Sequence, residues 1–182
     1  MKTTVISYSL TGNNDALAAG IASRLSAEHI RVTESEPRTD GKIAFDMLLN
    51  RTPAVNPIAA NAADGGLVVF VAPVWMGCIA APLRAPIRQF KAGLAQYAFV
   101  SISGGADGPN PKLAGEWKKR TGKEPAAVVN FLIADLLPSD PKPTRGVTST
   151  YHLSEKDVKS LADKAVKILQ EAPAAGKPLL GK

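Results

Sequence analysis

The chain has 182 residues, enough for one domain with a full hydrophobic core, and its 45% apolar and 21% charged content excludes global disorder. A single cysteine, Cys78, excludes an internal disulfide and a cysteine-based zinc cluster, and the two histidines are too far apart in sequence to predict a metal site. No apolar run is long enough to span a membrane, and residues 1–14 do not read as a secretory signal, so we expect a cytoplasmic protein. The net charge of +6 leaves an anionic partner open.

Short apolar runs rich in β-branched residues alternate with helical patterns along residues 1–171. The most clearly marked helix begins after Ser154, because Asp157 completes a capping-box pattern and an apolar stripe follows at helical spacing. Strict alternation predicts right-handed βαβ units, and therefore a three-layer α/β fold around a doubly wound five-stranded parallel sheet. The predicted strands are 4–8, 30–34, 67–72, 98–103 and 127–134, and the predicted helices are 14–27, 43–50, 81–92, 112–121 and 155–171.

The predicted organisation is a single domain over residues 1–171, followed by a flexible C-terminal tail over residues 172–182, which is rich in Pro and Gly. Two internal segments lack periodicity. Residues 51–66 are interpreted as a surface excursion that leads into the third strand. Residues 136–153 are long for a connection in a compact domain, and two alternatives stay open for them: a lid or binding loop, or a mobile connection.

The first predicted strand ends in a run of hydroxyl, glycine and asparagine residues that opens into a helix. A strand that turns sharply into a helix start points several backbone N–H groups at one spot, where the helix dipole favours a phosphate. Hydroxyl groups can donate to phosphate oxygens, Gly12 lets the backbone approach closely, and Asn13 or Asn14 tolerates left-handed geometry. Ordinary turn and capping chemistry is the alternative, and the run matches neither the dinucleotide fingerprint nor the P-loop. The run consists of Ser9, Leu10, Thr11, Gly12, Asn13 and Asn14.

Two more loops follow the third and fourth predicted strands, at the carboxyl ends where doubly wound sheets bind ligands. Trp75 offers a flat face on which an aromatic ligand could stack, and its alternative role is a core side chain that covers the end of the sheet. The glycine-rich loop that begins at Ser103 can present backbone groups to the polar edge of a ring. The second loop contains Pro73, Val74, Trp75, Met76 and Gly77, and the third contains Ser103, Gly104, Gly105 and Asp107.

Together the three loops resemble those of the flavodoxin-like FMN-binding family, and the resemblance covers roughly residues 3–171. In that family a S/T-x-T-G-N loop holds the phosphate, an aromatic loop packs on the isoalloxazine, and a third loop hydrogen-bonds the pyrimidine edge. Residues 9–14 match the phosphate loop, the second loop matches the pattern P-x-W-x-G, and residues 103–107 occupy the place of the third loop. The resemblance implies FMN as the cofactor, the strand order 2-1-3-4-5, and a flavin site at the switch point of the sheet.

Two departures from the family pattern bear on function. Electron-carrier flavodoxins usually sandwich the flavin between two aromatic rings and are typically acidic, whereas residues 103–110 contain no aromatic and this chain is basic. An uncovered flavin face favours an FMN-dependent oxidoreductase that reduces a quinone-like or similar acceptor with NAD(P)H. Two alternatives stay open: a flavodoxin-type electron carrier with a redox partner protein, and a flavodoxin-like domain without flavin in a regulatory or interaction role. No residue stands out as a catalytic acid, base or nucleophile.

A basic cluster, Lys118-Lys119-Arg120 with Lys123, has two interpretations. It is either the solvated end of a helix that Gly122 terminates, or a face for nucleic acid, anionic lipid or a phosphorylated substrate such as NADPH. Nucleic acid is the weakest of these expectations, because no recognised binding motif accompanies the cluster and aromatic residues are sparse. Cys78 either packs as a small apolar residue or approaches the flavin. The sequence predicts neither a bound metal nor a membrane partner, and it leaves a homodimer open.

Overall fold

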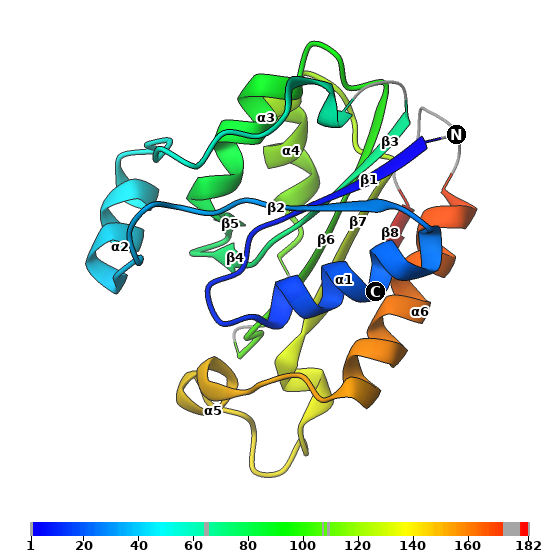
Figure 1. Ribbon diagram of the computed structural model, residues 1–182. Helices are drawn as coiled ribbons and strands as arrows, with labels where there is room; N and C mark the ends of the chain where they lie inside the picture. The colour runs from blue at the N-terminus through cyan, green and yellow to red at the C-terminus, as the bar shows by residue number, and fades with distance from the viewer. Residues whose placement is uncertain (1, 64–65, 107, 109, 173–178, 182) are drawn as a thin grey trace.

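A parallel β-sheet with helices on both faces forms the centre of the molecule (Figure 1). The computed structural model describes residues 2–63, 66–106, 108, 110–172 and 179–181. The sheet strands are β1 (Lys2–Ser7), β2 (Glu28–Arg31), β3 (Gly66–Val71), β6 (Gln96–Ser103), β7 (Ala127–Leu132) and β8 (Leu179–Gly181). Their order is β2-β1-β3-β6-β7-β8, and each neighbouring pair is parallel. The first five of these strands have the predicted order 2-1-3-4-5, which confirms the doubly wound α/β fold.

Helices connect the strands as the sequence pattern predicted, and short elements occur between them. Two strands of two residues each, β4 (Val74–Trp75) and β5 (Cys78–Ile79), form an antiparallel hairpin that is separate from the main sheet. None of the described helices combines the length and the apolar composition needed to cross a membrane. The helices are α1 (Asn13–Leu25), α2 (Asp40–Leu48), α3 (Arg84–Phe90), α4 (Leu113–Thr121), α5 (Arg145–Thr150) and α6 (Glu155–Glu171), and the 3-10 turns are η1 (Ala60–Ala63), η2 (Ala81–Leu83) and η3 (Ile133–Leu136).

Two hydrophobic cores lie on opposite faces of the sheet. Because successive strand residues point to opposite faces, Val5 and Val69 belong to the core under α1 and α6, whereas Ile6 and Phe70 belong to the core under α3 and α4. Figure 1 shows α1 and α6 side by side on one face and α3 and α4 on the other. Both faces of the central strands are therefore buried, which explains why these strands read as continuous apolar runs.

Aromatic rings fill the core under α4. The side chain of Trp117 is fully buried, and its ring centroid lies 4.9 Å from that of Phe99, 5.1 Å from that of Phe70 and 5.5 Å from that of Tyr97. The Tyr97 hydroxyl donates to the carbonyl of Lys123 at 2.7 Å. Burial raises the pKa of Tyr97 to about 12, so this hydroxyl remains a hydrogen-bond donor.

Several predicted elements differ from the structure in their bounds, and the helix predicted over 81–92 forms η2 followed by α3. The strand predicted over 127–134 ends at Leu132, and the apolar run continues as η3. The strand predicted over 30–34 is β2 and covers Glu28–Arg31. β2 is an edge strand, and its polar residues form no continuous apolar run that would mark its ends. Within the long segment predicted as a loop over 136–153, the structure forms the helix α5.

The predicted C-terminal tail contains a sixth strand that the sequence pattern did not indicate. β8 pairs with β7 in parallel, with Ala127 opposite Leu179 and Val129 opposite Gly181. Residues 173–178 and 182 lie outside the described residues, so the flexible tail stays a prediction for them. The single domain over residues 1–171 also stays a prediction.

Candidate functional site

The three loops that the sequence singled out meet at the carboxyl edge of the sheet (Figure 1). The ring of Tyr8, directly after β1, contacts the ring of Trp75 edge to face, with centroids 5.7 Å apart. The backbone N–H of Val74 donates to the hydroxyl of Ser103 at 3.0 Å, which joins the second loop to the third. The predicted convergence of the loops after β1, β3 and β6 is therefore present in the fold.

The loop at residues 9–14 leaves the N-terminus of α1 open. Gly12 is the N-cap residue with a φ of 92°, and no side chain caps the helix. The N–H of Gly12 donates to the Ser9 hydroxyl at 3.0 Å, which closes the turn, while Leu10 and Thr11 are exposed. A helix start whose N–H groups have no side-chain cap is a favourable place for a phosphate.

Asn13 and Asn14 do not adopt the left-handed geometry that the sequence allowed them, because Gly12 does so and both asparagines lie in α1. Their side chains are buried and bind backbone far along the chain. The Asn13 amide accepts from the N–H of Leu153 at 3.0 Å and donates to the carbonyl of Tyr151 at 2.7 Å. Asn13 thereby holds the segment after α5 against the first loop.

Asn14 forms the corresponding pair of hydrogen bonds with β6, accepting from the N–H of Ile102 at 3.0 Å and donating to its carbonyl at 2.9 Å. Replacing Asn14 by alanine leaves two buried backbone groups without partners, so we expect the free energy of unfolding to fall by about 2 kcal/mol. Urea unfolding measures this. The matched control is Asn56→Ala on the surface, which we expect to cost less than about 0.5 kcal/mol. Equal losses for the two variants would contradict this role of Asn14.

The second loop is a hairpin whose turn carries two residues with positive φ, Met76 at 50° and Gly77 at 78°. This geometry matches the right-handed twist of the two flanking strands. Trp75 is half-buried, and the Arg38 guanidinium carbon lies 5.9 Å from the centroid of its ring. Met76 at the tip of the hairpin is 73% exposed. Trp75 thus packs partly against the core and is partly accessible, and its role as a stacking face stays a prediction.

The third loop requires glycine. Gly105 has a φ of 77°, and a Cβ added there would lie 2.5 Å from the Cβ of Leu132. A Cβ on Gly104 would lie 2.9 Å from the hydroxyl of Thr148, so α5 packs directly on this loop. The Asn110 amide donates to the carbonyl of Gly77, which ties the third loop to the hairpin. Asp107, which the sequence placed in this loop, lies outside the described residues.

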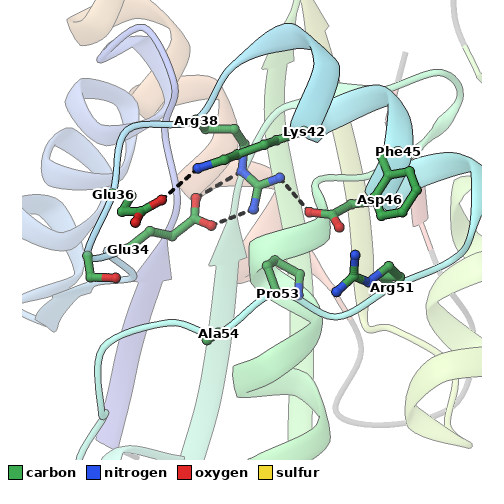
Figure 2. Close-up of a pocket in the computed structure, with 10 residues that line it drawn as sticks. Glu34, Glu36, Arg38, Lys42, Phe45, Asp46, Arg51, Pro53 and Ala54 are labelled. Atoms are coloured by element: carbon green, nitrogen blue, oxygen red, sulfur yellow. Dashed lines mark hydrogen bonds and ion pairs between the residues drawn. The ribbon is translucent and has the colours of Figure 1, made fainter.

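A cluster of ionic side chains that the sequence reasoning missed lies next to Trp75. Figure 2 shows Arg38 between the carboxylates of Glu34 and Asp46, and the Arg38–Asp46 distance is 2.7 Å. These groups line a cavity of about 290 Å³, the Glu34–Arg38 cavity. The Tyr8 hydroxyl donates to Glu34 at 3.1 Å, and burial together with the Glu34 carboxylate raises the pKa of Tyr8. These ionic residues come after β2, an edge strand, where charged side chains usually face solvent. No pattern in the sequence therefore predicted that they form a cluster.

A second polar cluster joins the ends of β1 and β2. The Ser7 hydroxyl lies 2.8 Å from Nε2 of His29 and donates to Asp15 at 3.2 Å. Asp15 in turn accepts from Nε of Arg31 at 2.7 Å. Burial lowers the pKa of His29 below its usual value of 6.5, while Asp15 opposes this shift and Arg31 adds to it. The folded chain therefore favours neutral His29.

This shift predicts how stability depends on pH. At pH values between the lowered pKa of the folded state and 6.5, the unfolded chain binds more protons at His29 than the folded chain does. The stabilising contribution of neutral His29 is therefore fully present above pH 6.5 and is lost as the pH falls. We expect the difference in unfolding free energy between the wild-type chain and His29→Gln to shrink from about pH 7.5 to about pH 5. Urea unfolding at several pH values checks this. A difference that grows as the pH falls would contradict the burial of a neutral imidazole.

Comparisons with known proteins bear on the fold. No family model and no curated protein sequence matches the chain. A flavoprotein from Lactobacillus acidophilus, solved in complex with FMN, is 23% identical, with 72% of this chain and 91% of that chain covered and a TM-score of 0.57. A flavodoxin from the domain Archaea is 14% identical, with 94% and 99% covered and a TM-score of 0.54. Identities this low establish the fold alone, and together with the strand order they show that this chain has the flavodoxin-like fold.

Proposed function

We propose that the chain binds FMN at the carboxyl edge of the sheet and is a cytoplasmic FMN-dependent oxidoreductase that reduces a quinone-like or similar acceptor with NAD(P)H. The observation that carries the proposal is the meeting of an uncapped α1 N-terminus, a half-buried tryptophan and a glycine-rich loop at one edge of the sheet. The similar flavoprotein from Lactobacillus acidophilus, whose structure contains FMN, supports the same cofactor.

The residues present fit the parts of FMN. The phosphate would be held by the backbone N–H groups at the start of α1 and by the exposed hydroxyl of Thr11. Trp75 offers the accessible part of its ring to the flavin, and Arg38 and Tyr8 hold that ring in position. The backbone of the loop after Ser103 is left bare by its glycines and can meet the polar edge of the flavin.

When bound, FMN would supply the redox chemistry, so the lack of an evident catalytic acid or base does not count against this reaction. The residues of the chain bind and orient. The Tyr8 hydroxyl keeps its proton, because burial and the neighbouring Glu34 carboxylate raise its pKa. Asn13 and Asn14 fix the first loop to the backbone after α5 and to the end of β6, which holds the start of α1 still. Positioning of this kind is the contribution that a protein makes to cofactor chemistry.

Replacing Trp75 by alanine tests the binding mode. We expect FMN affinity to fall roughly tenfold to a hundredfold, since stacking of an aromatic ring on a base is worth about 1–3 kcal/mol. Quenching of flavin fluorescence on titration measures the affinity. Trp117→Phe is the matched control, because it changes the other tryptophan, which lies in the core. Equal FMN affinity in both variants would remove Trp75 from the site.

Turnover tests the reaction. FMN-loaded protein is expected to oxidise NADH or NADPH in the presence of a quinone, and absorbance at the nicotinamide band follows the rate. A panel of quinone, flavin and dye acceptors covers the acceptor class. If FMN binds but no acceptor supports oxidation of either nicotinamide, the oxidoreductase proposal fails and an electron carrier takes its place.

A further inference from the structure

A cavity of about 520 Å³, here named the cationic cavity, lies between α2, α3, α4 and the hairpin strand β5. Its volume is typical of small-molecule sites, which span about 300–1,000 Å³. Met47 and Ile87 give it an apolar part. Its charged lining consists of five basic side chains and one carboxylate: Arg84, Arg88, Lys91, Lys119, Arg120 and Glu116.

The single carboxylate is already occupied. One oxygen of Glu116 accepts from Nε of Arg120 at 2.9 Å, and the other accepts from a backbone N–H of β5 at 2.8 Å. Glu116 therefore pairs with Arg120, although its charge also acts on Arg84, and it is the one carboxylate against five cations in the lining of the cavity. Within the part of the chain that the structure describes, no carboxylate forms an ion pair with Arg88, Lys91 or Lys119. The cavity thus carries a local excess of positive charge.

Arg84 is the most deeply buried of these cations, with 4% of its surface exposed. It donates to the carbonyls of Arg51 at 2.6 Å and Asp46 at 3.2 Å, but its Nε–H is buried without a partner among the described residues. Burial lowers the pKa of Arg84, the nearby positive charge of Arg120 adds to the effect, and the charges of Glu116 and Asp46 oppose it without cancelling it. Arginine keeps its charge in proteins, so these guanidinium groups repel each other and a bound anion would stabilise them.

The Glu34–Arg38 cavity shows the contrasting case. Three carboxylates and three cations line it, and Figure 2 shows ion pairs between them. Arg38 lies between Glu34 and Asp46, and Lys42 donates to Glu36 at 2.8 Å. Its charges are therefore balanced from within the chain, whereas those of the cationic cavity are not.

We propose that the cationic cavity binds a small organic molecule that carries a diphosphate or triphosphate group. Guanidinium groups match phosphate oxygens in a bidentate way, and several cations around one concave space favour an anion with more than one charge. The apolar lining leaves room for an organic part beside the phosphates. The second interpretation of the basic cluster, a face for a phosphorylated ligand, thus applies to Lys119 and Arg120, whereas Lys118 pairs with Glu124 at 2.6 Å.

The cavity adjoins the proposed flavin site without belonging to it. Cys78 lines the cavity, and its partner across the hairpin is Trp75. The inference rests on charge, burial and volume, and it holds whether or not the chain binds flavin. Because Cys78 is the only cysteine, its thiol reports on the cavity specifically. Burial raises the pKa of this thiol, so the wild-type reaction with a neutral reagent will be slow but measurable.

Calorimetric titration with pyrophosphate at low salt tests the proposal. We expect saturable binding of pyrophosphate, and Lys91→Gln combined with Lys119→Gln to weaken that binding roughly tenfold. Both side chains are exposed, so the double variant is expected to fold. The matched control is Lys164→Gln combined with Lys167→Gln, which removes the same charge from exposed positions on α6. Pyrophosphate is also expected to slow alkylation of Cys78 by iodoacetamide at least severalfold, by occlusion and by its negative charge.

Four results would overturn the proposal. The first is absence of saturable pyrophosphate binding to the wild-type chain. The second is an equal loss of binding in the two double variants, which would reduce the effect to net charge. The third is alkylation of Cys78 that pyrophosphate leaves unchanged. The fourth is tighter binding of a single-stranded oligonucleotide than of pyrophosphate, with that affinity lost in the cavity variant, which would make this face a nucleic-acid surface. FMN titration of the same variants keeps these outcomes separate from the proposed function.

Discussion

Replacing Trp117 by alanine is expected to lower the free energy of unfolding by about 3–5 kcal/mol, the usual cost of emptying a large aromatic site in a core. The Trp117 side chain is fully buried and its ring touches three other aromatic rings, which come from β3 and β6. Since these are central strands of the sheet, the cavity would lie where the surrounding backbone can collapse least. Urea unfolding followed by circular dichroism measures the loss.

Phenylalanine at the same position provides the control. The indole Nε1–H of Trp117 is buried without a hydrogen-bond partner among the described residues, so Trp117→Phe removes an unsatisfied donor along with part of the ring. We expect this variant to lose no more than about 1.5 kcal/mol. If Trp117→Phe proved as damaging as Trp117→Ala, the shape of the indole rather than the filled volume would dominate, contrary to this account.

Replacing Arg38 by methionine is the second change with a large expected effect, a loss of about 3–5 kcal/mol. The Arg38 side chain is 3% exposed, and it pairs with Glu34 and Asp46, whose side chains are 14% and 11% exposed. Methionine keeps the volume of the aliphatic chain but leaves two nearly buried carboxylates without their cation. The cost arises from these uncompensated charges, because exposed ion pairs alone contribute little. Thermal and urea unfolding at neutral pH measure it.

Arg51→Met is the matched control in the same cavity. The Arg51 guanidinium lies 5.0 Å from the centroid of the Phe45 ring, and no carboxylate among the described residues forms an ion pair with it. We expect this variant to lose less than about 1 kcal/mol, the value of an exposed cation–π contact. Similar losses for Arg38→Met and Arg51→Met would show that the carboxylates do not depend on Arg38.

The sequence predicted correctly those elements whose capping residues and apolar spacing lie within the element itself. α6 runs from Glu155 to Glu171 as predicted, because the Ser154 and Asp157 side chains form the complete capping box. β2 was misplaced because an edge strand exposes polar side chains, so an apolar run does not mark it. The strand predicted over 127–134 extended too far, because an apolar run alone does not distinguish a strand from the start of η3 at Ile133.

The candidate site shows the same limit. The run at residues 9–14 located the helix start, and Gly12 takes the positive φ that glycine permits. The roles of Asn13 and Asn14 were not predictable, because their hydrogen-bond partners lie 88 to 140 residues away in the sequence. Each partner is a backbone group, which no side-chain motif reveals.

The sequence contains a pattern of basic residues at the cationic cavity that neither composition nor motifs indicated. Arg84, Arg88 and Lys91 are spaced four and three residues apart, so they share one face of α3 and its end. The remaining two cations come from α4, which the fold places beside α3. A basic face on a short, mostly apolar helix predicts an anion-facing surface only when the neighbouring helix is known.

The most direct test of the central claim is a titration of the purified chain, freed of any bound flavin, with FMN, followed by flavin absorbance and fluorescence. We expect saturable binding of one FMN per chain, with quenched fluorescence and a shifted absorbance band as the flavin ring contacts Trp75. Riboflavin, which lacks the phosphate, should bind more weakly, because the start of α1 then loses its ligand. An unchanged flavin spectrum and unquenched fluorescence at excess FMN would contradict the account and leave a flavodoxin-like fold with a different role.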